Sequence, residues 1–267
     1  MKMSESIANV LEISHVGKSF MVDGEERVVL QDVTFSVGEQ ELLCVVGPSG
    51  SGKSTLLKIM SGLLKPTSGS VVLEGDIIIE PPSKLAMVFQ EYSRSLLPWM
   101  DVQSNVTLPL TSAGMSRANA KERAAEMLEA VGLSHTAKQY PWQLSGGMQQ
   151  RVAIARALAY MPDILLMDEP FAAVDAQTRM ELQDLVLRLQ AEFSLSILFV
   201  THDIDEAVYL GQRVIALTKT PTVVAREVTI DLPLKRDQIE TKRLDRFGTL
   251  RAELMELIAA QKMERAE

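Results

Sequence analysis

Apolar residues fall into short continuous runs separated by longer segments of mixed polarity. Runs with almost no polar interruption occupy residues 42–46, 85–89, 164–167 and 197–200. Runs of this length predict strands buried on both faces of an α/β sheet. Between two of them, Leu182, Leu185, Val186 and Leu189 form a stripe at helical spacing, which predicts a helix with its apolar face in the core. The pattern therefore predicts an α/β fold.

The region before residue 47 is predicted to be rich in strands. We expect separate strands at 10–13, 28–30 and 33–37, with a turn at Asp23-Gly24. After residue 52 we expect a helix over 53–61 that ends at Gly62, a turn at 66–69, and strands at 70–73 and 77–79.

Strand patterns disappear between residues 91 and 160. Ala120, Ala124, Met127, Leu128 and Val131 have helical spacing, Gly132 follows them, and a second helix is predicted over 146–160. We expect this block, about 91–160, to be a helical subdomain inserted into the α/β core.

The later part of the chain returns to the α/β pattern. It predicts a helix at 204–210, strands at 214–217 and 223–230, and a terminal helix with Leu250, Leu254, Leu257 and Ile258 on its apolar face. One domain of 1–267 is expected, with a core and β-subdomain over about 7–90 and 161–230 and a helical tail over about 235–267.

Composition limits the possible functions. The 267 residues are 46% hydrophobic and carry a formal net charge of −8, which argues against a nucleic-acid partner. Cys44 is the single cysteine of the sequence; it lies in an apolar run and is interpreted as a small core residue. Met1–Ser6 opens no signal-type segment, and no run approaches the ~20 apolar residues of a membrane span. We expect a cytoplasmic protein that needs a partner to act across a membrane.

A glycine-rich loop between a predicted strand and a predicted helix carries the clearest chemistry. It fits the pattern G-x-x-x-x-G-K-[ST] and consists of Gly47, Pro48, Ser49, Gly50, Ser51, Gly52, Lys53, Ser54 and Thr55. Small residues let backbone N–H groups curl around a polyphosphate, and the helix start adds its positive dipole. Lys53 can reach the outer phosphates, and the hydroxyl of Ser54 can hold Mg²⁺. The loop indicates a nucleoside triphosphate site.

Polar residues at three other strand ends extend this prediction. Asp168 and Glu169 follow one buried run, Gln90 follows another, and His202 a third. In open α/β sheets such positions contact the ligand. Asp168 can orient Mg²⁺, and Glu169 can accept a proton from an attacking water. Phe20, upstream in a polar stretch, is either a core residue or a face on which a base stacks.

The stretch Leu144-Ser-Gly-Gly-Met-Gln-Gln-Arg151 resembles the signature of ATP-binding-cassette (ABC) ATPases. Ser145 and the N–H groups of Gly146 and Gly147, at a helix start, can receive an anion. The other family motifs occur in the right order: the glycine loop, Gln90 as the Q-loop, the Asp168-Glu169 pair as Walker B, Asp175 in the D-loop and His202 as the switch histidine. The resemblance covers about residues 10–220.

The resemblance implies a role for each matching residue and a set of partners. Lys53, Ser54 and Thr55 would serve ATP and Mg²⁺; Gln90 would sense the metal and water, and Phe20 would stack on the base. Glu169 would be the base for hydrolysis, His202 would contact the γ-phosphate, Ser145 and Gly147 would meet ATP on the other subunit, and Asp175 would link the two sites. The implied assembly is a homodimer under two membrane permease subunits, fed by a solute-binding protein and lying on the cytoplasmic face of the bacterial inner membrane.

Several stretches resemble the ATPases of nitrate, sulfonate and taurine importers. They are Val88-Phe-Gln90, Leu96-Leu-Pro-Trp99, Tyr140-Pro-Trp-Gln-Leu-Ser145 and Phe199 to Ala207. The family commonly has Gly-Ala-Leu-Asp where this chain has Ala172-Ala-Val-Asp175, and Gly-Glu where it has Gln40-Glu41. We expect Leu96–Met100 to dock on the membrane subunit, with internal packing as the alternative. A non-transport ABC ATPase acting on DNA or ribosomes and a P-loop kinase are the competing functions.

Overall fold

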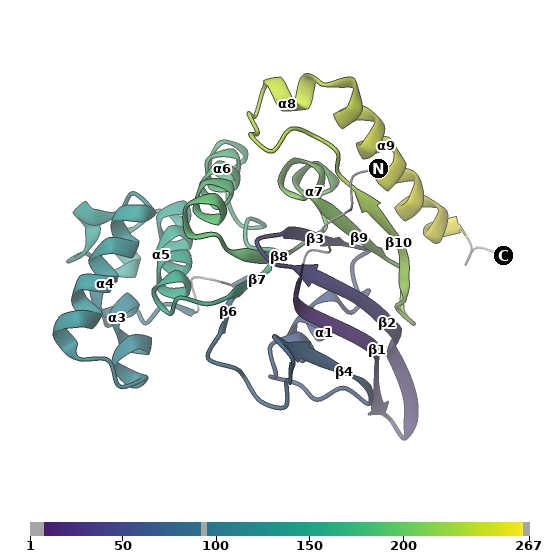
Figure 1. Ribbon diagram of the computed structural model, residues 1–267, viewed down its shortest axis with the longest axis horizontal. Helices are drawn as coiled ribbons and strands as arrows, with labels where there is room; N and C mark the ends of the chain where they lie inside the picture. Colours follow the sequence, from purple (N-terminus) through teal and green to yellow (C-terminus); the bar gives the residue numbers. More distant parts are fainter. Residues whose placement is uncertain (1–7, 92–94, 264–267) are drawn as a thin grey trace.

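Two sheets form the framework of the computed structural model, which describes residues 8–91 and 95–263 (Figure 1). The larger sheet has six strands in the order β10-β9-β3-β8-β7-β6. Their bounds are β3 (Leu42–Val46), β6 (Leu85–Val88), β7 (Ile164–Asp168), β8 (Ser196–Thr201), β9 (Arg213–Leu217) and β10 (Val224–Thr229). All neighbouring pairs are parallel except β10 with β9, so the predicted α/β core is confirmed.

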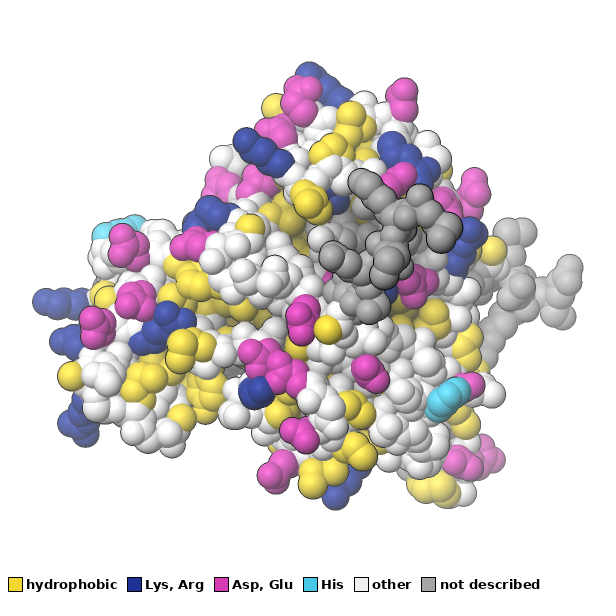
Figure 2. Space-filling view, in the orientation of Figure 1, with side chains coloured by type: hydrophobic (Ala, Val, Ile, Leu, Met, Phe, Trp, Pro, Cys, Tyr) yellow, Lys and Arg dark blue, Asp and Glu magenta, His cyan; other side chains and the backbone are white. Residues whose placement is uncertain are grey.

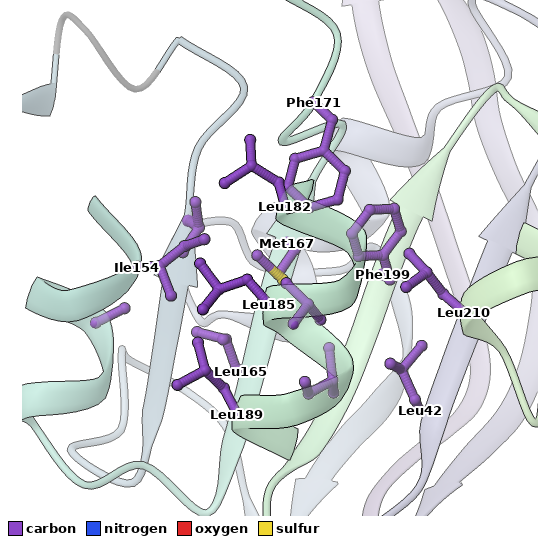
Figure 3. Packing of buried hydrophobic residues seen from close by; sticks show 14 of the residues in the cluster. Leu42, Ile154, Leu165, Met167, Phe171, Leu182, Leu185, Leu189, Phe199 and Leu210 are labelled. Atoms are coloured by element: carbon purple, nitrogen blue, oxygen red, sulfur yellow. The ribbon is translucent and has the colours of Figure 1, made fainter. Parts of the chain in front are cut away.

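The strands of this sheet are buried on both faces, which explains their continuous apolar runs. In β7, Leu165 and Met167 face one hydrophobic cluster, and Ile164 and Leu166 face another. Helices α5 (Gly146–Ala159), α6 (Ala176–Phe193) and α7 (Ile204–Leu210) cover the first face. On that face Leu182, Leu185 and Leu189 of α6 point at the strands (Figure 3). The predicted α6 stripe is therefore core.

The second face packs against α1 (Lys53–Met60) and a four-stranded antiparallel sheet of order β2-β1-β4-β5. Its strands are β1 (Asn9–Val22), β2 (Glu25–Gly38), β4 (Ser68–Leu73) and β5 (Asp76–Ile77). The prediction of separate short strands before residue 38 was wrong, because β1 and β2 form one long hairpin. His15 and Asp32 interrupt the apolar alternation with positive φ angles of 51° and 55°, yet pairing continues past them. Phe20 consequently lies within β1.

The block predicted to be helical contains α3 (Val102–Ser112), α4 (Arg117–Ala130) and α5, with short 3₁₀ turns η1 (Ser134–Thr136) and η2 (Pro141–Gln143). It forms the lobe at the left of Figure 1. The sequence did not predict α3, because Pro109 lies inside it and discourages a helical assignment. Asp101 caps α3, its side chain accepting a hydrogen bond from the Ser104 N–H at 2.7 Å.

The chain ends in α8 (Glu240–Arg243) and α9 (Asp245–Met263). Phe247, Leu250 and Leu254 of α9 are buried in the core cluster that includes α7. None of the helices in residues 8–91 and 95–263 has the length and hydropathy needed to cross a membrane. Met1–Ser6, where no signal-type segment was expected, lies outside the described residues.

Parallel pairing brings the candidate residues to one edge of the six-stranded sheet. Val46 is in register with Thr201, Asp168 with Val200, and Val88 with Met167. The residues that follow these strand ends lie at the same edge, which is where open α/β sheets bind ligands.

Candidate active site

The glycine loop runs from β3 into α1 as the sequence predicts. Gly50 and Gly52 have φ angles of 77° and 79°, which side chains rarely adopt. A Cβ on Gly52 would also lie 2.9 Å from Cγ1 of Val29 in β2. Gly52 is thus required both by the backbone conformation and by the close approach of β2.

The side chain of Lys53 folds back onto the glycine loop. Its Nζ donates hydrogen bonds to the carbonyl oxygens of Gly47 at 3.0 Å and Pro48 at 3.1 Å, and lies 3.6 Å from Oε1 of Glu169. Burial lowers the pKa of Lys53, and the charge of Glu169 partly opposes this shift. A polyphosphate in the loop would supply the anionic partner that this buried ammonium favours.

A cavity of about 360 Å³ lies over the loop. Residues from four parts of the chain line it: Val29, Ser49 to Thr55, Gln90 and Glu169. The structure therefore brings the loop, the Q-loop glutamine and the candidate base together in one chain.

Asp168 and Ser54 fit a divalent cation. Asp168 is buried, and its Oδ1 has no hydrogen-bond partner. Burial raises the pKa of Asp168, while the hydroxyl of Ser54 acts to lower this pKa, and a neighbouring cation would reverse the rise. Carboxylate and hydroxyl oxygens are ligands that Mg²⁺ prefers.

Glu169 is held between a cation and a histidine. Its Oε2 lies 2.8 Å from Nδ1 of His202, while its Oε1 faces Lys53. The backbone of Glu169 has a φ of 41°, and its N–H donates to the carbonyl oxygen of Val200 at 2.9 Å. This unusual backbone conformation turns the carboxylate toward the loop at the end of β7.

A buried polar network behind His202 was not predicted. Thr201 Oγ1 donates to Oε2 of Glu206 at 2.6 Å and accepts from the N–H of Asp203 at 3.0 Å. Arg179 of α6 reaches Asp203 at 3.4 Å and Glu206 at 3.7 Å. The sequence signal for Thr201, Asp203 and Glu206 was their placement beside His202, and Arg179, in α6, carried none. The network joins α6, which follows Asp175, to the turn that carries His202.

The signature residues lie at the start of α5, in the helical lobe, and do not line the cavity of their own chain. Ser145 caps α5 by accepting a hydrogen bond from the Met148 N–H at 3.3 Å, and Ser145 and Gly146 are exposed. A Cβ on Gly147 would lie 2.4 Å from Cγ2 of Thr178. Close packing of α5 on α6 thus requires a glycine here.

Asp175 and Phe20 also lie outside this cavity. Asp175 caps α6, accepting from the Thr178 N–H at 3.0 Å and its hydroxyl at 2.7 Å, and these bonds lower the pKa of Asp175. Phe20 is 38% exposed, so its interpretation as a core residue was wrong. The Nζ atom of Lys18 lies 5.1 Å from the centre of the Phe20 ring. Stacking on a base stays a prediction.

The segment 96–100 is only partly exposed. Trp99 is 71% exposed, but Leu96 is 1% exposed, which contradicts the expected exposed leucine. Asn105 explains this burial: its side chain donates to the carbonyl oxygens of Leu97, Met100 and Asp101 and accepts from the Leu97 N–H. The loop is folded onto α3 by these bonds, leaving Trp99 outside.

A groove of about 600 Å³ separates the helical lobe from the end of β6. Its lining includes Met87, Phe89, Leu108 and Tyr160. Hydrophobic side chains gather where the two parts meet in Figure 2, while charges of both signs are interspersed over the face shown. The groove adjoins Gln90, which follows Phe89 directly.

Comparisons with known proteins agree with this geometry. The family model described as ABC transporter matches residues 30–172. The nitrate import ATP-binding protein NrtD of Synechocystis sp. is 40% identical over 96% of this chain and 98% of its own length. The taurine import ATP-binding protein TauB of Roseobacter denitrificans is 40% identical over 93% of each. Among solved structures, a dimeric bacterial ABC transporter cassette superposes with a TM-score of 0.73. It is 36% identical in sequence, and the match covers 82% of this chain and 98% of the cassette. A second structure of the same cassette shows a post-hydrolysis state bound to ADP and phosphate.

Proposed function

This chain belongs to the ABC transporter family, and we propose that it hydrolyses ATP to drive the import of a small solute by a bacterial transporter. Nitrate, sulfonate, taurine or a related small solute is the proposed substrate, because the relatives named above are nitrate and taurine import subunits. The cavity that unites the glycine loop, Gln90 and Glu169 is the observation that carries the proposal. The relatives give no support to a role on DNA or ribosomes.

In the proposed mechanism the loop N–H groups hold the phosphates, and Lys53 leaves the loop carbonyls to meet the outer ones. Glu169 accepts the proton of the attacking water, and His202 supports Glu169 and contacts the γ-phosphate. Ser54, Asp168 and Gln90 are the proposed holders of Mg²⁺, which would neutralise phosphate charge.

The proposed active form is a head-to-tail homodimer. Ser145 and Gly146 are exposed at the start of α5, Gly147 follows them in the first turn, and all three lie in a different lobe from the glycine loop (Figure 1). A second copy could therefore present them to the ATP of the first, with Asp175 between the two sites. Loss of the γ-phosphate would open the dimer.

The transporter would include two permease subunits and a solute-binding protein. This ATPase would bind the permease subunits at the cytoplasmic face of the inner membrane. Trp99 and the groove beside Gln90 are the proposed docking surface, since exposed aromatic and apolar side chains favour protein contacts. In this view residues about 91–160 act as one helical subdomain, distinct from the core at about 7–90 and 161–230 and the tail at about 235–267.

The proposal is tested by purifying the chain from its native membranes and identifying the polytopic proteins that copurify. ATPase activity of the complex should rise when the solute and its binding protein are supplied in vesicles. Lys53→Ala should abolish hydrolysis in the same complex, because Lys53 is the only cationic side chain among the described residues that line the cavity. Activity that persists in Lys53→Ala, or copurification with ribosomes alone, would contradict the proposal.

A further inference from the structure

The turn between β9 and β10, residues 218–223, lies against the glycine loop. Oγ1 of Thr220 donates a hydrogen bond to the carbonyl oxygen of Gly50 at 2.8 Å. Oγ1 of Thr222 donates to the carbonyl oxygen of Ser51. Two hydroxyls thus hold two successive carbonyl groups of the loop, and the sequence analysis identified neither threonine.

The turn itself is well anchored. The N–H of Thr222 donates to the carbonyl oxygen of Val29 at 2.9 Å, and the Gln31 N–H donates back to the carbonyl oxygen of Thr222 at 2.8 Å. The N–H of Thr218 bonds to the carbonyl oxygen of Val223 at 3.0 Å. Thr222 is 0% exposed, so its hydroxyl has no water as an alternative partner.

The Thr220 bond fixes the peptide unit whose N–H, that of Ser51, donates to the carbonyl oxygen of Pro48 at 3.2 Å, and the Thr222 bond determines where the next N–H, that of Gly52, points. A peptide unit is planar and trans, so its C=O and N–H point in opposite directions. Holding the Ser51 carbonyl on Thr222 turns the Gly52 N–H away from Thr222. Gly52 lines the cavity and Thr222 does not, so this N–H is directed to the cavity side.

The loop needs such restraint because of its glycines. Gly50 and Gly52 allow the intervening peptide units to rotate at little steric cost. A rotated unit would present a carbonyl oxygen to the phosphates, which repel it. We propose that Thr222 and Thr220 are positioning residues that keep the glycine loop in its phosphate-binding conformation; this inference rests on the proposed function of the loop as an ATP site.

The test compares valine and serine variants of the purified full chain. Valine keeps the shape of threonine but removes the hydroxyl, while serine keeps the hydroxyl. We expect Thr222→Val and Thr220→Val each to raise the Kd and the KM for ATP about three- to tenfold, the factor expected for one hydrogen bond. The value of kcat should change little, because phosphate binding is lost equally from the ground and transition states. Thr222→Ser and Thr220→Ser should restore affinity.

Thr136→Val is the matched control. Thr136 is also 0% exposed and donates its hydroxyl to a carbonyl oxygen, that of Leu133, at 2.8 Å in the helical lobe. The Thr136→Val variant should have a lower melting temperature than the wild type and an unchanged Kd for ATP. This separates loss of a buried hydrogen bond in general from loss of loop positioning.

Folded Thr222→Val and Thr220→Val proteins with wild-type Kd and KM would overturn the inference, as would failure of the serine variants to restore affinity. If Thr222→Val does not fold, Thr220→Val decides, because its side chain lies nearer the surface. Wild-type protein that binds no ATP would overturn both this inference and the proposed function. ATP binding that depends on Lys53 but not on either threonine would overturn this inference alone.

Discussion

Replacing Glu169 by glutamine should separate nucleotide binding from hydrolysis. The amide keeps the shape of the side chain but cannot accept a proton from water. Loss of a general base typically slows a reaction about 10²–10⁴-fold, which corresponds to roughly 3–5 kcal/mol on the barrier. We expect a fall in kcat of this size for Glu169→Gln.

The structure also predicts the effect on ATP affinity. Oε1 of Glu169 lies 3.6 Å from Nζ of Lys53, and both side chains are largely buried. Two unit charges at this separation attract by roughly 4–5 kcal/mol at an effective dielectric of about 20, which is an upper limit because solvation offsets much of it. Removing the carboxylate frees Lys53 for the polyphosphate, so Glu169→Gln should bind ATP at least as tightly as the wild type.

Hydrolysis is measured by single-turnover phosphate release, affinity by calorimetry, and assembly by size-exclusion chromatography with light scattering. With Mg²⁺ and ATP, Glu169→Gln should accumulate as a dimer, and adding Ser145→Arg should prevent it. Glu192→Gln is the control, since Glu192 is an exposed carboxylate paired with Arg188. If kcat of Glu169→Gln falls by less than tenfold, Glu169 is not the general base for hydrolysis. A Glu169→Gln protein that binds ATP yet stays monomeric would refute the head-to-tail dimer for the isolated subunit.

Three further changes test other parts of the molecule. Phe20→Ala should weaken ATP binding by about 1–3 kcal/mol, the size of base–aromatic stacking; an unchanged Kd would remove Phe20 from the site. Trp99→Ala should abolish solute uptake in vesicles while the isolated subunit keeps its fold and ATP affinity, whereas unfolding would favour internal packing. Gly147→Ala should lower stability by about 1–3 kcal/mol through its contact with Cγ2 of Thr178. Thr178→Ser removes that methyl but keeps the hydroxyl on Asp175, so the double variant should regain stability in thermal unfolding.

Some of the fold was predictable because the responsible interactions are local or periodic. The buried strands β3, β7 and β8 leave continuous apolar runs, since both of their faces meet a hydrophobic cluster. The glycine loop was predictable because its nine adjacent residues contain all the groups that the motif requires. Glu169, Gln90 and His202 could be placed at one edge because parallel strands end together.

Other features follow only from contacts between distant parts of the chain. From the sequence, Leu96 was predicted to be an exposed docking residue. In the structure it is buried, because hydrogen bonds to Asn105 hold its loop against α3. Pro109 argues against a helix, yet α3 forms around it because Val106 and Leu110 are buried against the lobe. In each case burial in the folded lobe outweighs the local preference.

The division between sequence and tertiary structure is clearest at the glycine loop. The sequence by itself determined the strand, the glycine-rich turn and the helix start from which phosphate binding is predicted, because these are local properties. Only the tertiary structure decided which way its peptide units face. Thr222 reaches the Ser51 carbonyl across 171 residues of chain. No periodicity records such a contact, since it exists only once β9 pairs with β3 and sets the following turn against the loop.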